Sequence, residues 1–399
     1  MKPITRREFL KHTGLALAVL ALPSTSKVIT PPVSIDALLW YYTRDAWNNV
    51  VIRNRQRAML SSRVYPKAIF VRDSFYGPLA LNDGRLGYDC YRWFERTQDP
   101  LSGQIRTAVP FLAENEFLFQ PQDDDSSLLF IAWSMWLKRR GFPINRAILE
   151  KAFDFVKAHV QNDWFVSAAG PFRYWADTVA AEVDERITHN QGLYVLALRS
   201  MIELGWGGVT DRDLTAARSN YIACYRSDIG ALRLGLDSWW NDKLDISVVF
   251  PEFMLRYLFS ESALPDYIIR STVDHVLQVA SIYKNGLIAG VKVICANDGS
   301  FLLPEKFFAA VLNRQGDYQN GGYWPMYTLT ALALRYKIDP SPTLKQTIEQ
   351  LVRSELATDH RSKEVILMIP GEVGLFDPNR SGYTWNALIA PALKWAKVV

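Results

Sequence analysis

Residues 317–325 read Asp-Tyr-Gln-Asn-Gly-Gly-Tyr-Trp-Pro and join two kinds of sequence that alternate along the chain. Before them lies a long polar connection, residues 297–320, which contains glycine, proline, aspartate and aromatic residues. After them, residues 327–336 carry apolar side chains at i, i+3 and i+4, a spacing that places them on one face of a helix. The stretch therefore predicts a loop that carries polar and aromatic side chains to the start of a helix.

The same alternation of helix and long loop extends over most of the chain. Helical spacing also occurs in residues 147–160, 191–204, 210–225, 248–259, 268–282 and 342–356. Long polar connections separate these stretches at residues 82–91, 94–109, 163–177, 237–245 and 369–382. Strand-like alternation is short, and residues 291–296 are the best example. Because helices alternate with long loops along the whole chain, we expect an all-α fold of helical hairpins closed into a ring. Long loops in a compact domain are usually functional, so we expect one set of them to line a cleft.

The composition permits one large core and argues against a nucleic-acid partner. The chain has 399 residues, of which 49% are hydrophobic, and its 45 Lys+Arg against 41 Asp+Glu give a net charge of only +4. The basic residues are scattered, whereas a nucleic-acid surface gathers them. The 13 Trp and 18 Tyr favour a carbohydrate partner, because sugar rings stack on aromatic faces, although most of these rings will pack in the core.

The first thirty residues predict export. Thr5-Arg6-Arg7-Glu8-Phe9-Leu10-Lys11 is a twin-arginine pattern, and an apolar run follows at residues 15–22. We expect residues 1–30 to be a signal and linker that the twin-arginine export machinery reads, and residues 31–399 to be one domain, periplasmic or extracellular. An ordinary amphipathic first helix is the alternative. No later stretch reaches the roughly 18 apolar residues that a membrane span needs.

Cysteine and histidine are too few and too scattered for a metal or redox site. Cys90, Cys224 and Cys295 are far apart in the sequence, and we expect them to be buried, reduced and apolar in character. The five histidines form no His-x-x-His or HExxH pattern, so we expect no metal. No Gly-x-Ser-x-Gly, GxxxxGK[ST] or GxGxxG motif occurs, which excludes the usual serine hydrolase and nucleotide sites, and we expect no cofactor.

Carboxylates among aromatic and glycine residues are the remaining candidates for chemistry. Hydrolysis of a glycosidic bond needs two of them, one to protonate the leaving oxygen and one to activate water or attack the sugar. The candidates lie in five stretches: residues 70–75 with Asp73, 122–127 with Asp123, Asp124 and Asp125, 172–178 with Asp177, 317–325 with Asp317, and 369–378 with Glu372.

Each stretch also has a purely structural interpretation. Asp73 could form an ion pair with a neighbouring arginine, and Asp177 could cap a helix that opens at Thr178. For Asp123 and Asp124 we prefer a solvated helix N-terminus, where acidic side chains interact favourably with the helix dipole. Residues 320–322 could be a tight turn, and Glu372 could be exposed in a flexible loop. Five such loops with similar composition favour a shared functional role.

These stretches resemble motifs of the six-hairpin glycosidases, especially the glycogen-debranching-type glucosidases and the neutral/alkaline invertases. Residues 70–75 resemble an early Arg-Asp, and residues 125–130 resemble an Asp-Ser-x-Leu-aromatic helix start. Residues 174–177 and 190–198 resemble a Trp-x-Asp segment and the helix after it. Residues 320–325 closely resemble an Asn-Gly-Gly-x-Trp-Pro loop, and residues 372–385 resemble a late Glu followed by Trp. The resemblance covers residues 72–385 and implies an (α/α)6 toroid of six helical hairpins.

The resemblance also assigns roles to individual residues. It makes Asp177 the general acid and Glu372 the general base of an inverting hydrolase, whose carboxyl groups stand roughly 6.5–9.5 Å apart. The neighbours Tyr174 and Trp175 should raise the pKa of Asp177 by desolvating it. The implied substrate contacts are Arg72, Asp73, Asp125, Trp175, Asn320, Tyr323 and Trp324. One residue departs from the pattern, because the family's glutamate on the helix after the acid falls near His189 or Asn190.

Three other functions share part of this pattern. A sugar epimerase or polysaccharide lyase would use the same fold, but it would need well-placed histidine or tyrosine bases. A terpene-cyclase-like toroid is suggested by residues 123–125 and the tryptophans, but the Gln-rich tryptophan repeats of that class are absent. A non-catalytic carbohydrate-binding toroid is the alternative outside enzymology. Measuring reducing-sugar release from a panel of disaccharides separates the enzyme from the binder.

Overall fold

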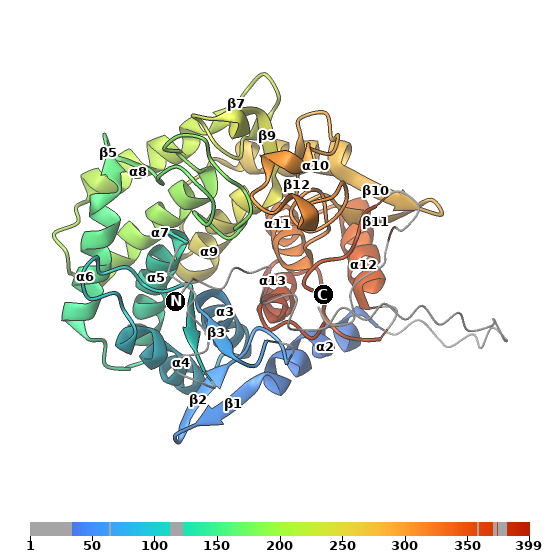
Figure 1. Cartoon of the computed structure of the whole chain (residues 1–399). Coiled ribbons are helices and arrows are strands. Elements are labelled where there is room, and N and C mark those ends of the chain that lie inside the picture. The colour runs from blue at the N-terminus through green and yellow to red at the C-terminus, as the bar shows by residue number, and fades with distance from the viewer. Residues whose placement is uncertain (1–33, 64, 112–122, 357–358, 370–372, 374–380) are drawn as a thin grey trace.

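The computed structural model describes residues 34–63, 65–111, 123–356, 359–369, 373 and 381–399. The predicted export signal and the predicted base, Glu372, lie outside the described residues. Within the described residues, twelve α-helices form two concentric rings (Figure 1). The predicted all-α toroid of helical hairpins is confirmed.

The inner ring consists of every second helix along the chain. Its members are α3 (Val71–Leu81), α5 (Asp125–Arg139), α7 (Thr188–Leu204), α9 (Phe250–Phe259), α11 (Pro325–Ile338) and α13 (Ile389–Trp395). Each inner helix contacts the next, and α13 contacts α3, which closes the ring. The outer helices are α2 (Ile35–Asn48), α4 (Gly84–Arg96), α6 (Arg146–Ala158), α8 (Asp211–Ala223), α10 (Asp266–Ala280) and α12 (Pro342–Leu356).

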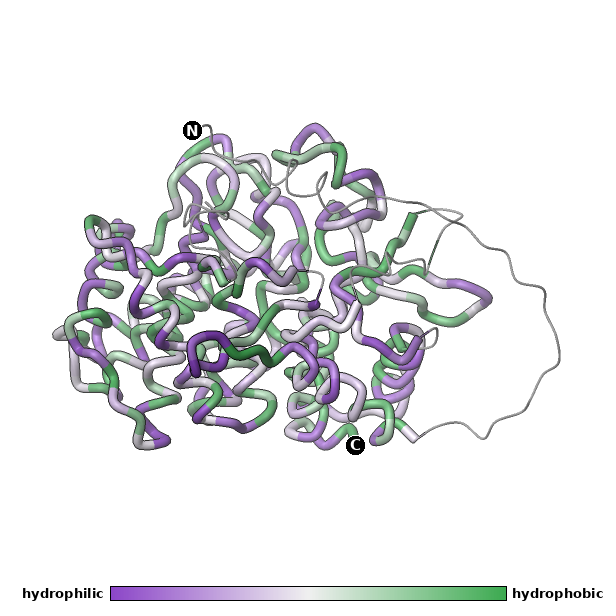
Figure 2. The backbone as a smooth tube through the Cα atoms, turned by 60° about the horizontal axis from the view of Figure 1, so that its bottom comes forward, coloured by the Kyte–Doolittle hydropathy of each residue, from purple (hydrophilic) through white to green (hydrophobic). Residues whose placement is uncertain are grey.

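The two rings differ in how their side chains are buried. The inner helices α5, α7 and α11 are buried on nearly every side, as expected of helices that pack against neighbours all round. The outer helices α4, α6 and α10 bury one face and expose the other. Hydrophobic and hydrophilic stretches therefore alternate along the chain (Figure 2). None of the helices in the described part of the chain is long and apolar enough to cross a bilayer.

Short antiparallel strand pairs and 3₁₀ turns occupy the connections. The pairs are β1 (Val50–Arg53) with β2 (Gln56–Met59), β3 (Ala68–Phe70) with β4 (Ala108–Pro110), β5 (Val160–Gln161) with β6 (Trp164–Phe165), β7 (Tyr225–Arg226) with β8 (Ala231–Leu232), β9 (Lys243–Asp245) with β12 (Ile294–Ala296), and β10 (Ser281–Lys284) with β11 (Leu287–Val291). The 3₁₀ turns are η1 (Trp239–Asp242), η2 (Ile246–Val249), η3 (Pro304–Lys306), η4 (Ala310–Leu312) and η6 (Trp385–Leu388). Two of these pairs, β3 with β4 and β9 with β12, join segments that are distant in sequence and fix them relative to one another.

The first outer helix, α2, completes the ring by packing against the last part of the chain. The Tyr42 hydroxyl donates to the carboxylate of Glu355 in α12. Just after α2, the Asn49 amide donates to the Thr384 hydroxyl at 2.9 Å. Asp45 accepts from the backbone N–H of Ser362 at 2.7 Å. These buried bonds join segments more than 300 residues apart in sequence.

Two predicted loops are helices instead. Residues 82–91 mostly belong to α4, because Asp83 caps the helix by accepting from the Leu86 N–H at 2.8 Å. Gly87 allows a close contact, since a Cβ there would lie 2.5 Å from the ring of Trp136. Residues 71–75 form the first turns of α3. The glycine and aspartate that suggested loops serve here as close-packing and capping residues. Cys90, Cys224 and Cys295 are buried and free, as predicted.

Candidate active site

Most of the predicted site residues lie at the N-terminal ends of inner helices. Arg72 and Asp73 are in the first turn of α3, and Asp125 is the first residue of α5. Trp324 directly precedes α11, and His189 is the second residue of α7. In a ring of hairpins every inner helix starts at the same end, so these positions meet at one end of the toroid.

Arg72 is the centre of a buried ionic group. Its Nη2 lies 2.8 Å from Asp125 Oδ1 and 2.9 Å from Asp125 Oδ2, and 3.0 Å from Asp123 Oδ2. All three side chains are buried. Burial raises the pKa of Asp125, while the positive charge of Arg72 opposes that shift. The two aspartates hold the pKa of Arg72 well above its usual value, so the guanidinium stays charged.

The prediction that Asp123 and Asp124 form a solvated helix N-terminus is wrong, because both side chains are buried. They do stand at the start of α5, but Asp123 binds Arg72 and Asp124 lies 4.0 Å from Arg173. Burial raises the pKa of Asp124 to about 7. Their partners, Arg72 and Arg173, come from other parts of the chain, which the local sequence does not reveal.

Replacing Arg72 by methionine should destabilise the fold strongly. The substitution leaves Asp123 and Asp125 buried without their cation, and breaking a buried ion pair from one side costs about 3 kcal/mol or more. Chemical denaturation followed by circular dichroism measures this loss. The matched control is Arg85→Met, which removes an exposed ion pair to Asp89 and should cost about 1 kcal/mol or less. Equal effects of the two changes would contradict the interpretation of the Arg72 group as a tightly held unit.

Asp73 is bound by two donors that come from outside its helix. It accepts from the Ser61 hydroxyl at 2.6 Å and from the Trp385 N–H at 3.2 Å. The ion pairs that Arg72 makes among the described residues are to Asp123 and Asp125, so the interpretation of Asp73 as its salt-bridge partner is not supported. Burial, with the negative charge of Glu364, raises the pKa of Asp73 to about 7. Asp73 can therefore hold a proton near neutral pH.

Asp177, the predicted general acid, is buried and held by the loop that precedes α11. Its Oδ1 accepts from Gln319 Nε2 at 3.0 Å, and the Tyr318 hydroxyl lies 3.5 Å from the same oxygen. The next residue, Thr178, donates its backbone N–H to Gln319 Oε1 at 2.9 Å. The helix-cap interpretation of Asp177 is wrong, because α7 begins only at Thr188.

The two glycines after Asn320 allow this loop to turn tightly. Gly321 has a φ of +84°, in the left-handed region that side chains disfavour. At Gly322, a Cβ would lie 2.3 Å from the carbonyl oxygen of Tyr318, so no larger residue fits. The Gly-Gly pair thus brings residues 318 and 319 back toward Asp177.

Asn320, a predicted substrate contact, is used within the loop. Its Nδ2 donates to the carbonyl oxygens of Leu302 and Asn313, at 2.9 Å each. Its Oδ1 accepts from the Leu302 N–H at 3.0 Å. These three bonds join the two halves of the connection between β12 and α11. Contact between Asn320 and a sugar stays a prediction.

Four aromatic rings from three segments of the chain meet between Asp73 and Asp177. This aromatic cluster consists of Trp175, Trp324, Tyr327 and Trp385. The ring centroids lie 4.2 Å apart for Trp175 and Tyr327, 5.1 Å for Trp175 and Trp324, and 5.6 Å for Trp324 and Trp385. Asp177 follows Trp175 by two residues, and Asp73 binds the backbone of Trp385. The structure therefore brings Asp73 and Asp177 to the same end of the ring, on two sides of the cluster.

Tyr323, an implied substrate contact, lies apart from the aromatic cluster. Its backbone pairs with Ile366, and Trp324 has extended dihedral angles, so successive side chains point in opposite directions. Trp324 points into the cluster, whereas Tyr323 lies near Glu355 and Tyr42. The opposite directions of the Tyr323 and Trp324 side chains could be predicted only from an extended backbone at these two residues, which the sequence did not indicate.

Asp245, which sequence analysis missed, organises the segment before Asp177. Its carboxylate accepts from the backbone N–H and the hydroxyl of Ser247, at 2.8 and 2.7 Å, and from the Tyr174 hydroxyl at 3.3 Å. The Ser247 hydroxyl in turn accepts from Trp175 Nε1 at 2.6 Å. Tyr174 and Trp175, which precede Asp177, are thus fixed by hydrogen bonds to Asp245 and to Ser247 of η2. Burial raises the pKa of Asp245 to about 7.

The raised pKa values of Asp73 and Asp245 predict a fold that is more stable in mild acid. An unfolded aspartate has a pKa near 3.9, so the folded chain binds more protons between about pH 4 and pH 7. The free energy of unfolding therefore falls as the pH rises through that range. Tm measured by circular dichroism should be higher at about pH 5 than at about pH 8.

Asp245→Asn should make that difference in Tm smaller, because the amide does not titrate. The control is Asp242→Asn, a neighbour whose side chain is half-exposed and which should leave the difference unchanged. A Tm difference that the Asp245 variant fully retains would show that this carboxyl does not titrate in the range.

The fold has been found in solved structures, although no family model and no curated protein matches the chain. A wild-type glycosidase superposes with a TM-score of 0.62 at 14% identity, over 90% of this chain and 96% of that chain. D-mannose isomerase gives a TM-score of 0.59 at 10% identity, over 94% and 99%. An α-amylase from Clostridium perfringens gives 0.53 at 10% identity, over 92% and 99%. The chain has a six-hairpin glycosidase-like fold.

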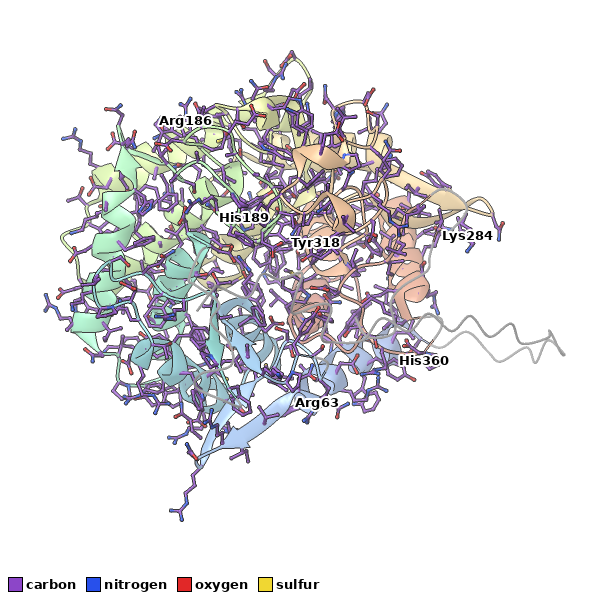
Figure 3. The ribbon with its side chains drawn as sticks, viewed as in Figure 1. Arg63, Arg186, His189, Lys284, Tyr318 and His360 are labelled. Atoms are coloured by element: carbon purple, nitrogen blue, oxygen red, sulfur yellow. The ribbon has the colours of Figure 1, made fainter. Side chains whose placement is uncertain are left out.

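Within this six-hairpin glycosidase-like fold, His189 is one of the two residues, with Asn190, near which the resemblance implies a glutamate. Its Nδ1 lies 3.0 Å from the carbonyl oxygen of Ser247, and its ring stacks on Phe250. Burial lowers the pKa of His189 to about 3, so the ring is neutral and donates from Nδ1. Figure 3 shows His189 and Tyr318 near the middle of the ring, with the other labelled residues farther out. His189 is therefore an uncharged ring beside Tyr327 of the aromatic cluster, with centroids 6.0 Å apart.

Proposed function

We propose that this protein is a glycoside hydrolase that cleaves an oligo- or disaccharide with inversion of configuration. The observation that carries the proposal is the position of Asp177, a buried carboxyl held by Gln319 at the edge of the aromatic cluster. The shared fold supports it, because a glycosidase of that fold covers 90% of this chain and a variant of it has been solved in complex with glucose.

In the proposed reaction, Asp177 donates a proton to the oxygen of the departing unit. Glu372, assigned by the resemblance, takes a proton from a water molecule as that water attacks the sugar from the opposite side. Each sugar carbon keeps its substituents except at the anomeric position, where the bond to the leaving oxygen breaks and a bond to water forms. After this step Asp177 is ionised and Glu372 is protonated, and proton exchange with solvent restores both carboxyl groups before the next turnover.

The Arg72 group and two tyrosine hydroxyls are suited to bind the sugar that is attacked. Arg72 and Asp125 supply fixed donors and acceptors, and Tyr327 lies close to both. The hydroxyls of Tyr76 and Tyr327 are buried and make no hydrogen bond within the described residues. A sugar hydroxyl that reached them would supply the missing partner. Trp175 and Trp385 offer apolar ring surface for the faces of the sugar.

A sugar isomerase or epimerase is the second candidate, because D-mannose isomerase shares the fold over 94% of this chain. Such chemistry moves a proton at a carbon atom and needs a base with a pKa near the working pH. The neutral His189, with its pKa lowered to about 3, is poorly suited to that task. A non-catalytic carbohydrate-binding protein is the third.

One experiment separates the three candidates. The purified protein is incubated with a panel of disaccharides and with free glucose and mannose, and proton NMR follows the anomeric signals. An inverting hydrolase first releases the anomer opposite to that of the substrate, before mutarotation. Release of the same anomer would instead imply a retaining enzyme, whereas conversion of free monosaccharide without hydrolysis would identify an isomerase. Binding without any conversion would identify the carbohydrate-binding protein.

A further inference from the structure

The loops on either side of Asp177 carry apolar side chains that face solvent. The exposed fraction is 58% for Phe308, 53% for Leu303 and 81% for Val311, all in the connection between β12 and α11. Phe172 precedes Asp177 and is partly exposed. Exposed apolar residues are ordinary when they are scattered, but Phe172 and Phe308 meet beside Asp177, and Leu303 and Val311 belong to the same connection as Phe308.

Backbone hydrogen bonds tie these residues to the proposed acid. The Phe172 N–H donates to the carbonyl oxygen of Asp177 at 3.0 Å, and the Phe308 N–H donates to that of Thr178 at 2.8 Å. The two rings meet edge to face with centroids 5.2 Å apart. Val179 and Phe307 pair in a β-bridge alongside. Figure 1 shows the two loops next to each other. The Phe172–Phe308 pair is thus fixed relative to Asp177.

The backbone at Phe172 is strained. Its φ is +61°, in the left-handed region, which is rare for a bulky side chain and costs of the order of 1–3 kcal/mol. A glycine would relieve the strain but would remove the ring that contacts Phe308. Strain of this kind persists where the surrounding structure holds it, and it often accompanies a ligand site.

We propose that Phe172, Phe308 and Val311 form the binding site for the leaving group, and that this site accepts an apolar, aromatic aglycone in place of the second sugar of a disaccharide. This inference rests on the proposed role of Asp177, because a general acid must touch the oxygen of the departing unit. The two ends of the substrate then meet different chemistry. Charged and hydroxyl groups around Arg72 bind the sugar, whereas exposed rings and aliphatic side chains beside Asp177 bind the aglycone.

Matched pairs of methyl and benzyl glycosides test the inference, because the two leaving alcohols have similar acidity. The α- and β-anomers of glucosides and mannosides form the panel. We expect kcat/KM for the benzyl compound to exceed that for its methyl partner by at least about fivefold. Phe308→Ser and Val311→Ser should both reduce this ratio toward one. The control is Tyr283→Ser, which removes an equally exposed ring from the β10–β11 hairpin and should leave the ratio as in the wild type.

The affinity of the Asp177→Asn variant for each glycoside provides a reading that does not depend on turnover. If the Asp177→Asn variant binds the benzyl glycoside more tightly than the methyl glycoside, and added Phe308→Ser removes that difference, the aglycone site is supported. This holds even if the wild type hydrolyses no glycoside, a result that would refute the proposed hydrolase but not the aglycone site. Equal affinities, or a ratio that Phe308→Ser does not change, would overturn the aglycone site while leaving the hydrolase intact. Both serine substitutions fall on exposed side chains, so folding should be retained, and circular dichroism checks it.

Discussion

Asp177→Asn should lower the hydrolysis of substrates with poor leaving groups by about 10²- to 10⁴-fold, the usual contribution of a general acid. A sugar leaving group departs slowly unless its glycosidic oxygen is protonated as the bond breaks. The amide of asparagine has no proton of suitable acidity to give. Asparagine has the shape of aspartate and can still accept from Gln319 Nε2 through its oxygen. The loss should therefore reflect chemistry and not a displaced loop.

Glycosides of acidic phenols provide the internal comparison for this variant. A phenolate leaves without protonation, so Asp177→Asn should retain most of its activity on these compounds. Asp154→Asn, on the exposed face of α6, is a matched control that should behave as the wild type on both substrates. A variant that lost both activities equally would show that Asp177 does not act as the acid.

Glu372→Gln should instead impair good and poor leaving groups alike, also by about 10²- to 10⁴-fold. Water must be activated whichever group departs, so the leaving-group ability does not compensate. Added azide should restore turnover, because this anion attacks without needing a base and fills the space of the activated water. The product is then a glycosyl azide of inverted configuration, which NMR identifies.

Glu364 supplies the comparison for the base. It is buried at the same end of the ring, near enough for its charge to raise the pKa of Asp73. If Glu372 is the base, Glu364→Gln should reduce activity without any rescue by azide. Azide rescue of Glu364→Gln, and not of Glu372→Gln, would move the role of base to Glu364.

The helical ring could be predicted because its signal is local and repeated. Spacing at i, i+3 and i+4 located α6 to α12, mostly within a few residues, since each helix has an apolar face or core. The loop at residues 320–325 was placed correctly before α11, because its two glycines and its proline constrain the backbone wherever it lies. The errors at α3 and α4 came from glycine and aspartate, whose local preferences were overridden by close packing and capping.

The environment of the site could be predicted much less well. Nothing near Asp245 in the sequence indicates that it holds Tyr174 and Ser247, which lie on different elements. The burial of Asp123 and Asp124 depends in the same way on loops from other hairpins. Gln319 stood next to the recognised Asn-Gly-Gly motif, and its proximity was the one available signal for its bond to Asp177. The sequence indicates which residue types the site contains. Their hydrogen-bond and ion-pair partners could not be predicted, because segments distant in sequence meet only when the ring has formed.

The joint between α2 and the last part of the chain has a consequence for biosynthesis. Tyr42, Asp45 and Asn49 bind partners that the ribosome adds more than 300 residues later, at Glu355, Ser362 and Thr384. Hairpins in the middle of the chain can assemble from local contacts while translation continues, but contacts this distant in sequence are slow to form. The circle is therefore completed only after Thr384 has emerged from the ribosomal tunnel, and until then the apolar faces of α2 and α3 lack the partners that cover them in the finished fold.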